Sequence, residues 1–87
     1  MKRLKQFIVR KIAGETVLVP FGETSQEFNG LITLNDVAAF IWENIENVET
    51  EEEMAKLLLE EFEVDEELAM RDAGQFIGGL KASGFIE

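Results

Sequence analysis

Residues 29–42 read NGLITLNDVAAFIW, and the spacing of the apolar side chains changes in the middle of this run. The first half is rich in β-branched and large apolar residues after a glycine, which is typical of a strand. In the second half the apolar residues follow the 3.6-residue period of a helix, and Asn35 is a favourable N-cap. We therefore expect a strand over residues 28–34, with a bulge or a close backbone approach at Gly30, followed directly by a helix over residues 36–45.

The residues before this run predict a β-hairpin. FIVRKI at residues 7–12 and TVLVPF at residues 16–21 have the composition of strands, and residues 13–15 supply a turn between them. Pro20 cannot donate a hydrogen bond to a sheet, so it belongs at a strand end or on an edge. Residues 22–26 are polar, and we expect them to form a loop.

Two further helices are expected after the first. Thr50 and Glu53 match a capping box, which starts a helix that extends to about residue 62. Asp65 is expected to cap the last helix, and Gly84 is expected to end it. The predicted core face of this last helix consists of Ala69, Ala73, Phe76, Ile77 and Leu80.

These elements predict an α+β fold of winged helix-turn-helix type, in which an N-terminal three-stranded antiparallel sheet is followed by three helices. The 87 residues are enough for a single domain over residues 1–87. A domain of this size has little interior to spare for an enclosed active site, so we expect any ligand to bind in a surface groove.

The residue inventory argues against catalysis. The chain has no Cys, His or Tyr, which removes disulfides, thiolate nucleophiles, zinc sites and imidazole acid–base chemistry. The acidic runs at residues 49–53 and 60–67 lack the alternating oxygen ligands and the central glycine of an EF-hand loop. We expect no enzymatic activity, no metal ion and no cofactor.

Charge is distributed unevenly along the chain. Five of the eight basic residues lie within residues 1–12, which contain no acid, so the remaining residues carry a net charge of −15. Such a surface repels phosphate backbones, and we expect no binding to nucleic acid. The acids either keep a small domain soluble or steer it towards a basic peptide or enzyme surface. The sequence shows neither a signal-peptide pattern nor a membrane-length apolar run, so we expect a cytoplasmic protein that does not bind membranes.

Two features predict a binding surface. Gly74, Gly78 and Gly79 lie inside the last helix, where each costs about 0.5–1 kcal/mol relative to alanine. Three explanations are open. The glycines are neutral substitutions that the fold tolerates, they allow another helix to pack closely, or they let an incoming chain pass near the backbone. An edge strand over residues 28–34 would be a template for a strand from another chain, and together with the last helix it would form a groove.

The sequence resembles the PqqD family over nearly its whole length. The resemblance rests on Val17–Pro20, residues 29–42, the capped acidic helix, and Val64–Ile86. It is most specific at the start of the first helix and in the last helix, where the family's spacing is kept by Asp72, Phe76, Leu80 and Gly84. It implies a winged helix-turn-helix that has become a peptide-recognition element, also called a RiPP recognition element.

The resemblance further implies a function. Members of the family bind the leader part of a ribosomally made precursor peptide as an added strand between the third strand and the third helix. They deliver it to a tailoring enzyme, often a radical SAM enzyme. The resemblance leaves open whether the pathway makes pyrroloquinoline quinone or another peptide product.

We therefore expect peptide contacts from both sides of the predicted groove. The strand side is expected to supply Gly30, Leu31, Ile32, Thr33 and Leu34. The helix side is expected to supply Leu68, Arg71, Asp72, Gln75, Gly78 and Gly79. Two other functions compete with this one: a degenerate winged-helix regulator of transcription, and a structural subunit of an enzyme complex. A homodimer formed by exchange of the N-terminal hairpin about residues 22–27 is a further hypothesis.

Overall fold

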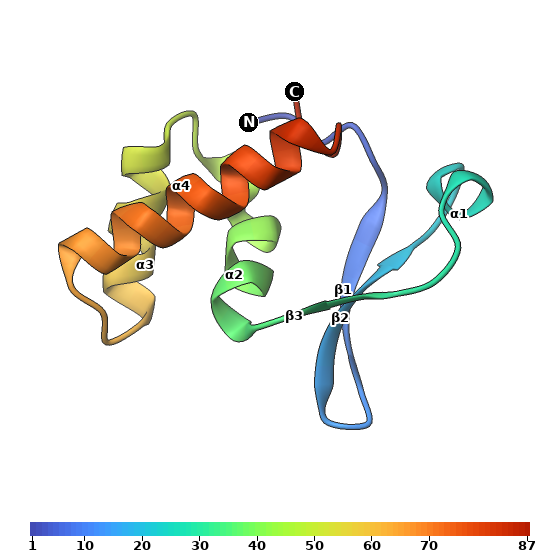
Figure 1. Cartoon of the computed structure of the whole chain (residues 1–87), viewed down its shortest axis with the longest axis horizontal. Coiled ribbons are helices and arrows are strands. Elements are labelled where there is room, and N and C mark those ends of the chain that lie inside the picture. The colour runs from blue at the N-terminus through green and yellow to red at the C-terminus, as the bar shows by residue number, and fades with distance from the viewer.

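The computed structural model describes residues 1–87 and confirms the expected α+β fold. Its elements, in chain order, are β1 (Phe7–Ile12), β2 (Glu15–Pro20), α1 (Thr24–Glu27), β3 (Ile32–Leu34), α2 (Asp36–Asn44), the 3-10 turn η1 (Ile45–Asn47), α3 (Glu51–Glu61) and α4 (Glu66–Ala82). In Figure 1 the hairpin projects away from a helical layer in which α4 lies across α2 and α3, and β3 leads directly into α2. None of the helices combines the length and the apolar character needed to span a bilayer.

The sheet is antiparallel with the strand order β1-β2-β3. The hairpin closes through Ala13 and Gly14, so the turn is one residue shorter than expected. β3 pairs only with β2, which makes it an edge strand, as the peptide-binding hypothesis requires. No other element forms a backbone hydrogen bond with it. One side of β3 is therefore open.

Two local predictions between the hairpin and α2 are wrong. β3 begins at Ile32 and does not cover residues 28–34. Gly30 has a φ of 110°, which favours glycine, so the chain turns ahead of the strand instead of bulging within it. The predicted polar loop at residues 22–26 contains α1, whose Thr24 is buried and accepts a 2.7 Å hydrogen bond from the Gln6 backbone N–H. This long-range contact explains why local composition did not reveal the helical turn.

The helix starts agree with the sequence. Asn35 accepts from the Ala38 N–H at 2.8 Å, Asp65 accepts from the Leu68 N–H at 2.8 Å, and Thr50 forms both halves of a capping box with Glu53. Because the Glu53 carboxylate also accepts from the Glu49 backbone N–H, its pKa is held below the ordinary value of 4.5. This stabilisation is present above pH 4.5 and is lost as the pH falls through the lowered pKa.

The helix ends differ slightly from the prediction. α2 stops at Asn44, and the chain tightens into η1, so the residue expected at its end lies in a 3-10 turn. The fold thus has four α-helices, of which α1 was not expected. α4 ends as predicted: Gly84 has a φ of 75°, and the Phe85 N–H donates to the Leu80 carbonyl at 2.9 Å, which is the Schellman arrangement.

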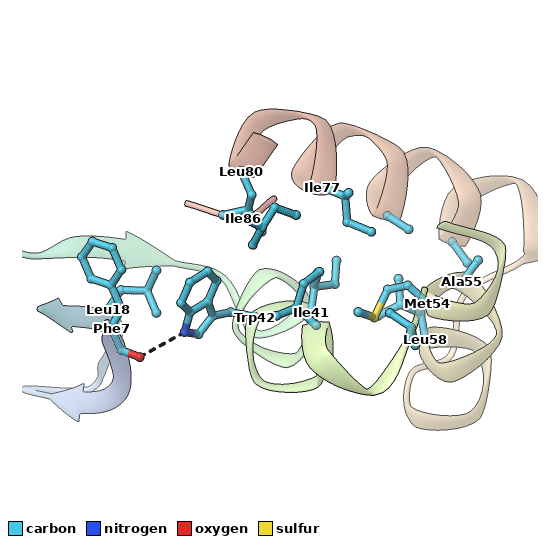
Figure 2. Packing of buried hydrophobic residues seen from close by; sticks show 14 residues of the cluster. Phe7, Leu18, Ile41, Trp42, Met54, Ala55, Leu58, Ile77, Leu80 and Ile86 are labelled. Atoms are coloured by element: carbon cyan, nitrogen blue, oxygen red, sulfur yellow. Dashed lines mark hydrogen bonds between the residues drawn. The ribbon is translucent and has the colours of Figure 1, made fainter. Parts of the chain in front are cut away.

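The core joins the sheet to the helices through Trp42 (Figure 2). Trp42 is almost fully buried, its indole N–H donates to the Phe7 carbonyl at 3.2 Å, and the two rings meet edge to face. α4 buries four of its five predicted core residues: Ala69, Ala73, Ile77 and Leu80. The fifth, Phe76, is only half-buried, because it stands at the border of the core and faces the space beside β3.

Candidate peptide-binding site

An apolar cavity of about 550 Å³ lies between β3 and α4. Its lining residues are Leu18, Phe28, Ile32, Leu34, Gln75, Phe76, Gly79, Leu80, Ser83 and Phe85. The Phe28 and Phe85 rings both stack on Phe7, at centroid distances of 5.4 and 4.9 Å, so one wall is anchored in the core. The cavity is open at the surface and presents mainly hydrophobic atoms.

A second, more polar cavity of about 310 Å³ continues from the first. It lies between α4 and the start of α2 and is lined by Asn35, Val37, Ala38, Ile41, Asp72, Gln75 and Phe76. Gln75 and Phe76 border both cavities, which therefore form one trough along α4. We call the two cavities together the β3–α4 groove.

The pairing pattern of the sheet decides which backbone groups of β3 are free. The Phe21 N–H donates to the Gln6 carbonyl at 3.0 Å, so these residues form a hydrogen-bonded pair, and such pairs alternate along antiparallel strands. The adjacent pair of Phe7 and Pro20 is then non-hydrogen-bonded, which suits a proline without an N–H. It follows that Leu18 directs its backbone groups towards β3.

The same alternation continues across β3. Ile32 and Leu34 pair with Leu18 and Thr16, and their backbone N–H and carbonyl groups face β2. Thr33, between them, directs its N–H and carbonyl towards the open edge. The side chains of Ile32 and Leu34 meanwhile line the groove. β3 thus offers free main-chain hydrogen-bonding groups beside an apolar trough.

Five of the eleven predicted site residues line the groove, and the other six do not. The residues that line the groove are Ile32, Leu34, Asp72, Gln75 and Gly79. The predicted residues that do not line it are Gly30, Leu31, Thr33, Leu68, Arg71 and Gly78. Gly30 and Leu31 also fall outside β3. Arg71 is exposed and lies 3.9 Å from the Asp72 carboxylate, outside the trough.

Sequence reasoning missed the aromatic residues of the groove. Phe28 was assigned to a strand and Phe76 to the core, and Phe85 follows Gly84 at the predicted end of the last helix; all three line the larger cavity. One signal was available in α4, since residues 76, 79 and 83 are spaced three and four apart and share a helix face. The contribution of Phe28 depends on a chain turn that the sequence did not reveal.

The three glycines of α4 have different surroundings. An added Cβ at Gly74 would meet the Glu51 carboxylate at 3.2 Å, so this glycine leaves room for that side chain at the start of α3. At Gly78 and Gly79 an added Cβ would meet nothing within 4 Å. Of these two, only Gly79 lines the groove. It keeps the groove wall low.

An edge strand with free backbone groups, placed beside an apolar groove on a winged helix-turn-helix scaffold, is the arrangement of domains that bind an extended peptide by strand addition. The chain belongs to the PqqD family, described as coenzyme PQQ synthesis protein D (PqqD), whose sequence model matches residues 15–86. This confirms the resemblance. Proteins of this family are non-catalytic peptide-binding chaperones, which agrees at the family level with the expectation that the chain is not an enzyme.

Two solved structures share this fold. One is described as TbiB1 in complex with the TbiA(beta) leader peptide; it has a TM-score of 0.68 and 24% sequence identity, over 100% of this chain and 95% of that chain. The other is described as lasso peptide synthetase B1 complexed with the leader peptide; it has a TM-score of 0.65 and 24% identity, over 94% of this chain and 91% of that chain. No curated protein sequence matches this chain.

Proposed function

We propose that this chain is a cytoplasmic carrier that binds the leader segment of a ribosomally made precursor peptide and presents it to a tailoring enzyme, for which a radical SAM enzyme is the first candidate. The leader adds to the open edge of β3 and lies along the β3–α4 groove. The observation that carries the proposal is the juxtaposition of free backbone groups on β3 with an apolar trough. Main-chain bonds supply affinity in such a complex, and side-chain pockets supply specificity.

The groove dimensions suit alternate side chains of an extended peptide. In a strand, side chains that point the same way are about 6.5–7 Å apart, so successive groove-facing residues fall into the two cavities in turn. The larger cavity favours a bulky apolar side chain, because seven of its ten lining residues are hydrophobic. The smaller one, bordered by Asn35, Asp72 and Gln75, favours a polar side chain that donates hydrogen bonds.

The similar solved structures support this proposal. Both are described as complexes with leader peptides, and both match this chain over at least 94% of its length. Their likeness concerns the fold, and the role of the β3–α4 groove in this chain rests on its own geometry.

A nuclear magnetic resonance titration tests where the leader binds. With a synthetic leader peptide of a ribosomally made precursor, we expect amide shifts at residues 31–34 and along the groove-facing side of α4. Amides of α3 are expected to move little, because α3 lines neither cavity. Shifts concentrated in α3 would show that the leader binds elsewhere.

Thr33→Pro is expected to weaken leader binding by about fivefold or more, since it removes one outward donor worth about 1 kcal/mol. The β2–β3 ladder should survive, because Thr33 does not donate to β2. Thr33→Val is the matched control: it keeps the N–H and changes only the side chain, so its affinity should stay near that of the wild type. Fluorescence anisotropy of a labelled leader measures both, with circular dichroism to verify folding. Equal affinities for the two variants would contradict strand addition at this edge.

A further inference from the structure

The face of the sheet that is turned away from the core carries an apolar surface of its own. Side chains alternate along strands, so residues next to the inward-facing Phe7 and Leu18 point outward. The outward apolar residues that remain accessible are Ile8, Ile12, Val19, Phe21 and Leu31, which we call the outer-face patch; Val17 shares this side of the sheet but is buried. None of them belongs to the core cluster or packs against it. Ile12, Phe21 and Leu31 are about half-exposed, at 47%, 48% and 53%.

The patch is continuous with the open edge of β3. Val19 pairs with Ile8 on one side, and the β2–β3 register, continued by one residue, places Leu31 on its other side. A peptide strand added to β3 would extend the sheet. Its groove-facing side chains would enter the two cavities, and the alternate ones would point to the outer face beside Leu31. A loaded carrier therefore has a larger outer face than an empty one.

Arg10 gives the patch a charge. It points outward between Ile8 and Ile12, opposite Val17, and forms no salt bridge. Arg3 and Lys5, from the same basic stretch, are in contrast paired with Glu46 and Glu27. An unpaired cation amid apolar side chains, on a chain with a net charge of −10, complements an apolar partner surface that presents a carboxylate.

We propose that the outer-face patch is the docking surface for the peptide-modifying enzyme and that the bound leader completes it. This inference rests on the proposed function. The enzyme would contact Phe21 and its neighbours together with the outward side chains of the peptide, and a carboxylate of the enzyme would meet Arg10. A second copy of the chain is the alternative occupant of this face, and light scattering distinguishes it from the enzyme.

The test uses a synthetic precursor leader that the protein binds and the purified enzyme that modifies the same precursor. Arg10→Glu and Phe21→Ser are expected to lower the affinity of the loaded protein for the enzyme roughly tenfold or more, without changing leader affinity. Lys56→Glu, which reverses an exposed cation on α3, is the control and should change neither. Wild-type protein should bind the enzyme more tightly with saturating leader than without it. Thermal unfolding verifies that each variant is folded, and Arg10→Glu decides the outcome if Phe21→Ser is not.

The possible failures are distinguishable. Absence of leader binding by the wild type would overturn the proposed function and, with it, this inference. Normal leader binding, with equal enzyme affinity for wild type and both variants, would overturn the docking surface alone. If light scattering showed a dimer that Phe21→Ser converts to monomers, a second copy would be the occupant and the enzyme assignment would be wrong.

Discussion

Gly79→Leu is expected to lower leader affinity at least tenfold in a protein that remains folded. Gly79 lines the larger cavity, and a side chain built there meets nothing within 4 Å. A leucine would therefore enter the space that we assign to the peptide without displacing any residue of the protein. A tenfold loss of affinity corresponds to about 1.4 kcal/mol, which is a modest fraction of the binding free energy of a peptide complex. Calorimetric titration with the leader measures the loss.

Gly78→Leu is the matched control for this experiment. Gly78 is the adjacent residue, is equally open, and lines neither cavity. Both substitutions replace a helical glycine, so each is expected to stabilise the protein by about 0.8–1 kcal/mol in thermal unfolding. Only Gly79→Leu should weaken the complex. Unchanged titration curves for Gly79→Leu, or an equal loss for Gly78→Leu, would contradict the placement of the peptide in the β3–α4 groove.

Trp42→Ala is expected to destabilise the protein by about 3–5 kcal/mol, because it removes the largest buried side chain at the junction of sheet and helices. The substitution also leaves the Phe7 carbonyl without its indole donor. A domain of this size has a small total stability, so a large unfolded population is expected at room temperature. Urea denaturation followed by circular dichroism measures the change.

Trp42→Phe is the milder substitution at this junction. It retains a six-membered aromatic ring against Phe7 but removes the indole N–H together with part of the ring system, so we expect a smaller loss than for alanine, of about 1–3 kcal/mol. The junction also sets the distance between the sheet and α4, and the folded Trp42→Phe protein should still bind the leader. Equal destabilisation by the two variants would contradict a stabilising role for the aromatic ring that Trp42→Phe retains.

Features that depend on residues close together in the sequence were predicted correctly, and features that depend on residues far apart in the sequence were not. Asn35, Thr50 and Asp65 cap the helices that follow them, and each cap depends on residues within one turn. α1 could not be predicted in the same way, because Thr24 is held by Gln6, eighteen residues earlier in the chain. The aromatic wall of the groove likewise required the packing of Phe28 and Phe85 on Phe7.

The sequence by itself determined the order of the three strands and the three long helices, most of the core face of α4 and the family, because these follow from periodicity, capping and motif spacing. Only the tertiary structure decided which residues share the groove. It placed Phe76 at the border of the core, Gly74 beside the Glu51 side chain and Gly79 on the groove wall, and it left the backbone of Thr33 facing outward. These assignments depend on the register between strands and on the approach of α4 to the sheet, and both are set by side chains distant in sequence that pack around Trp42.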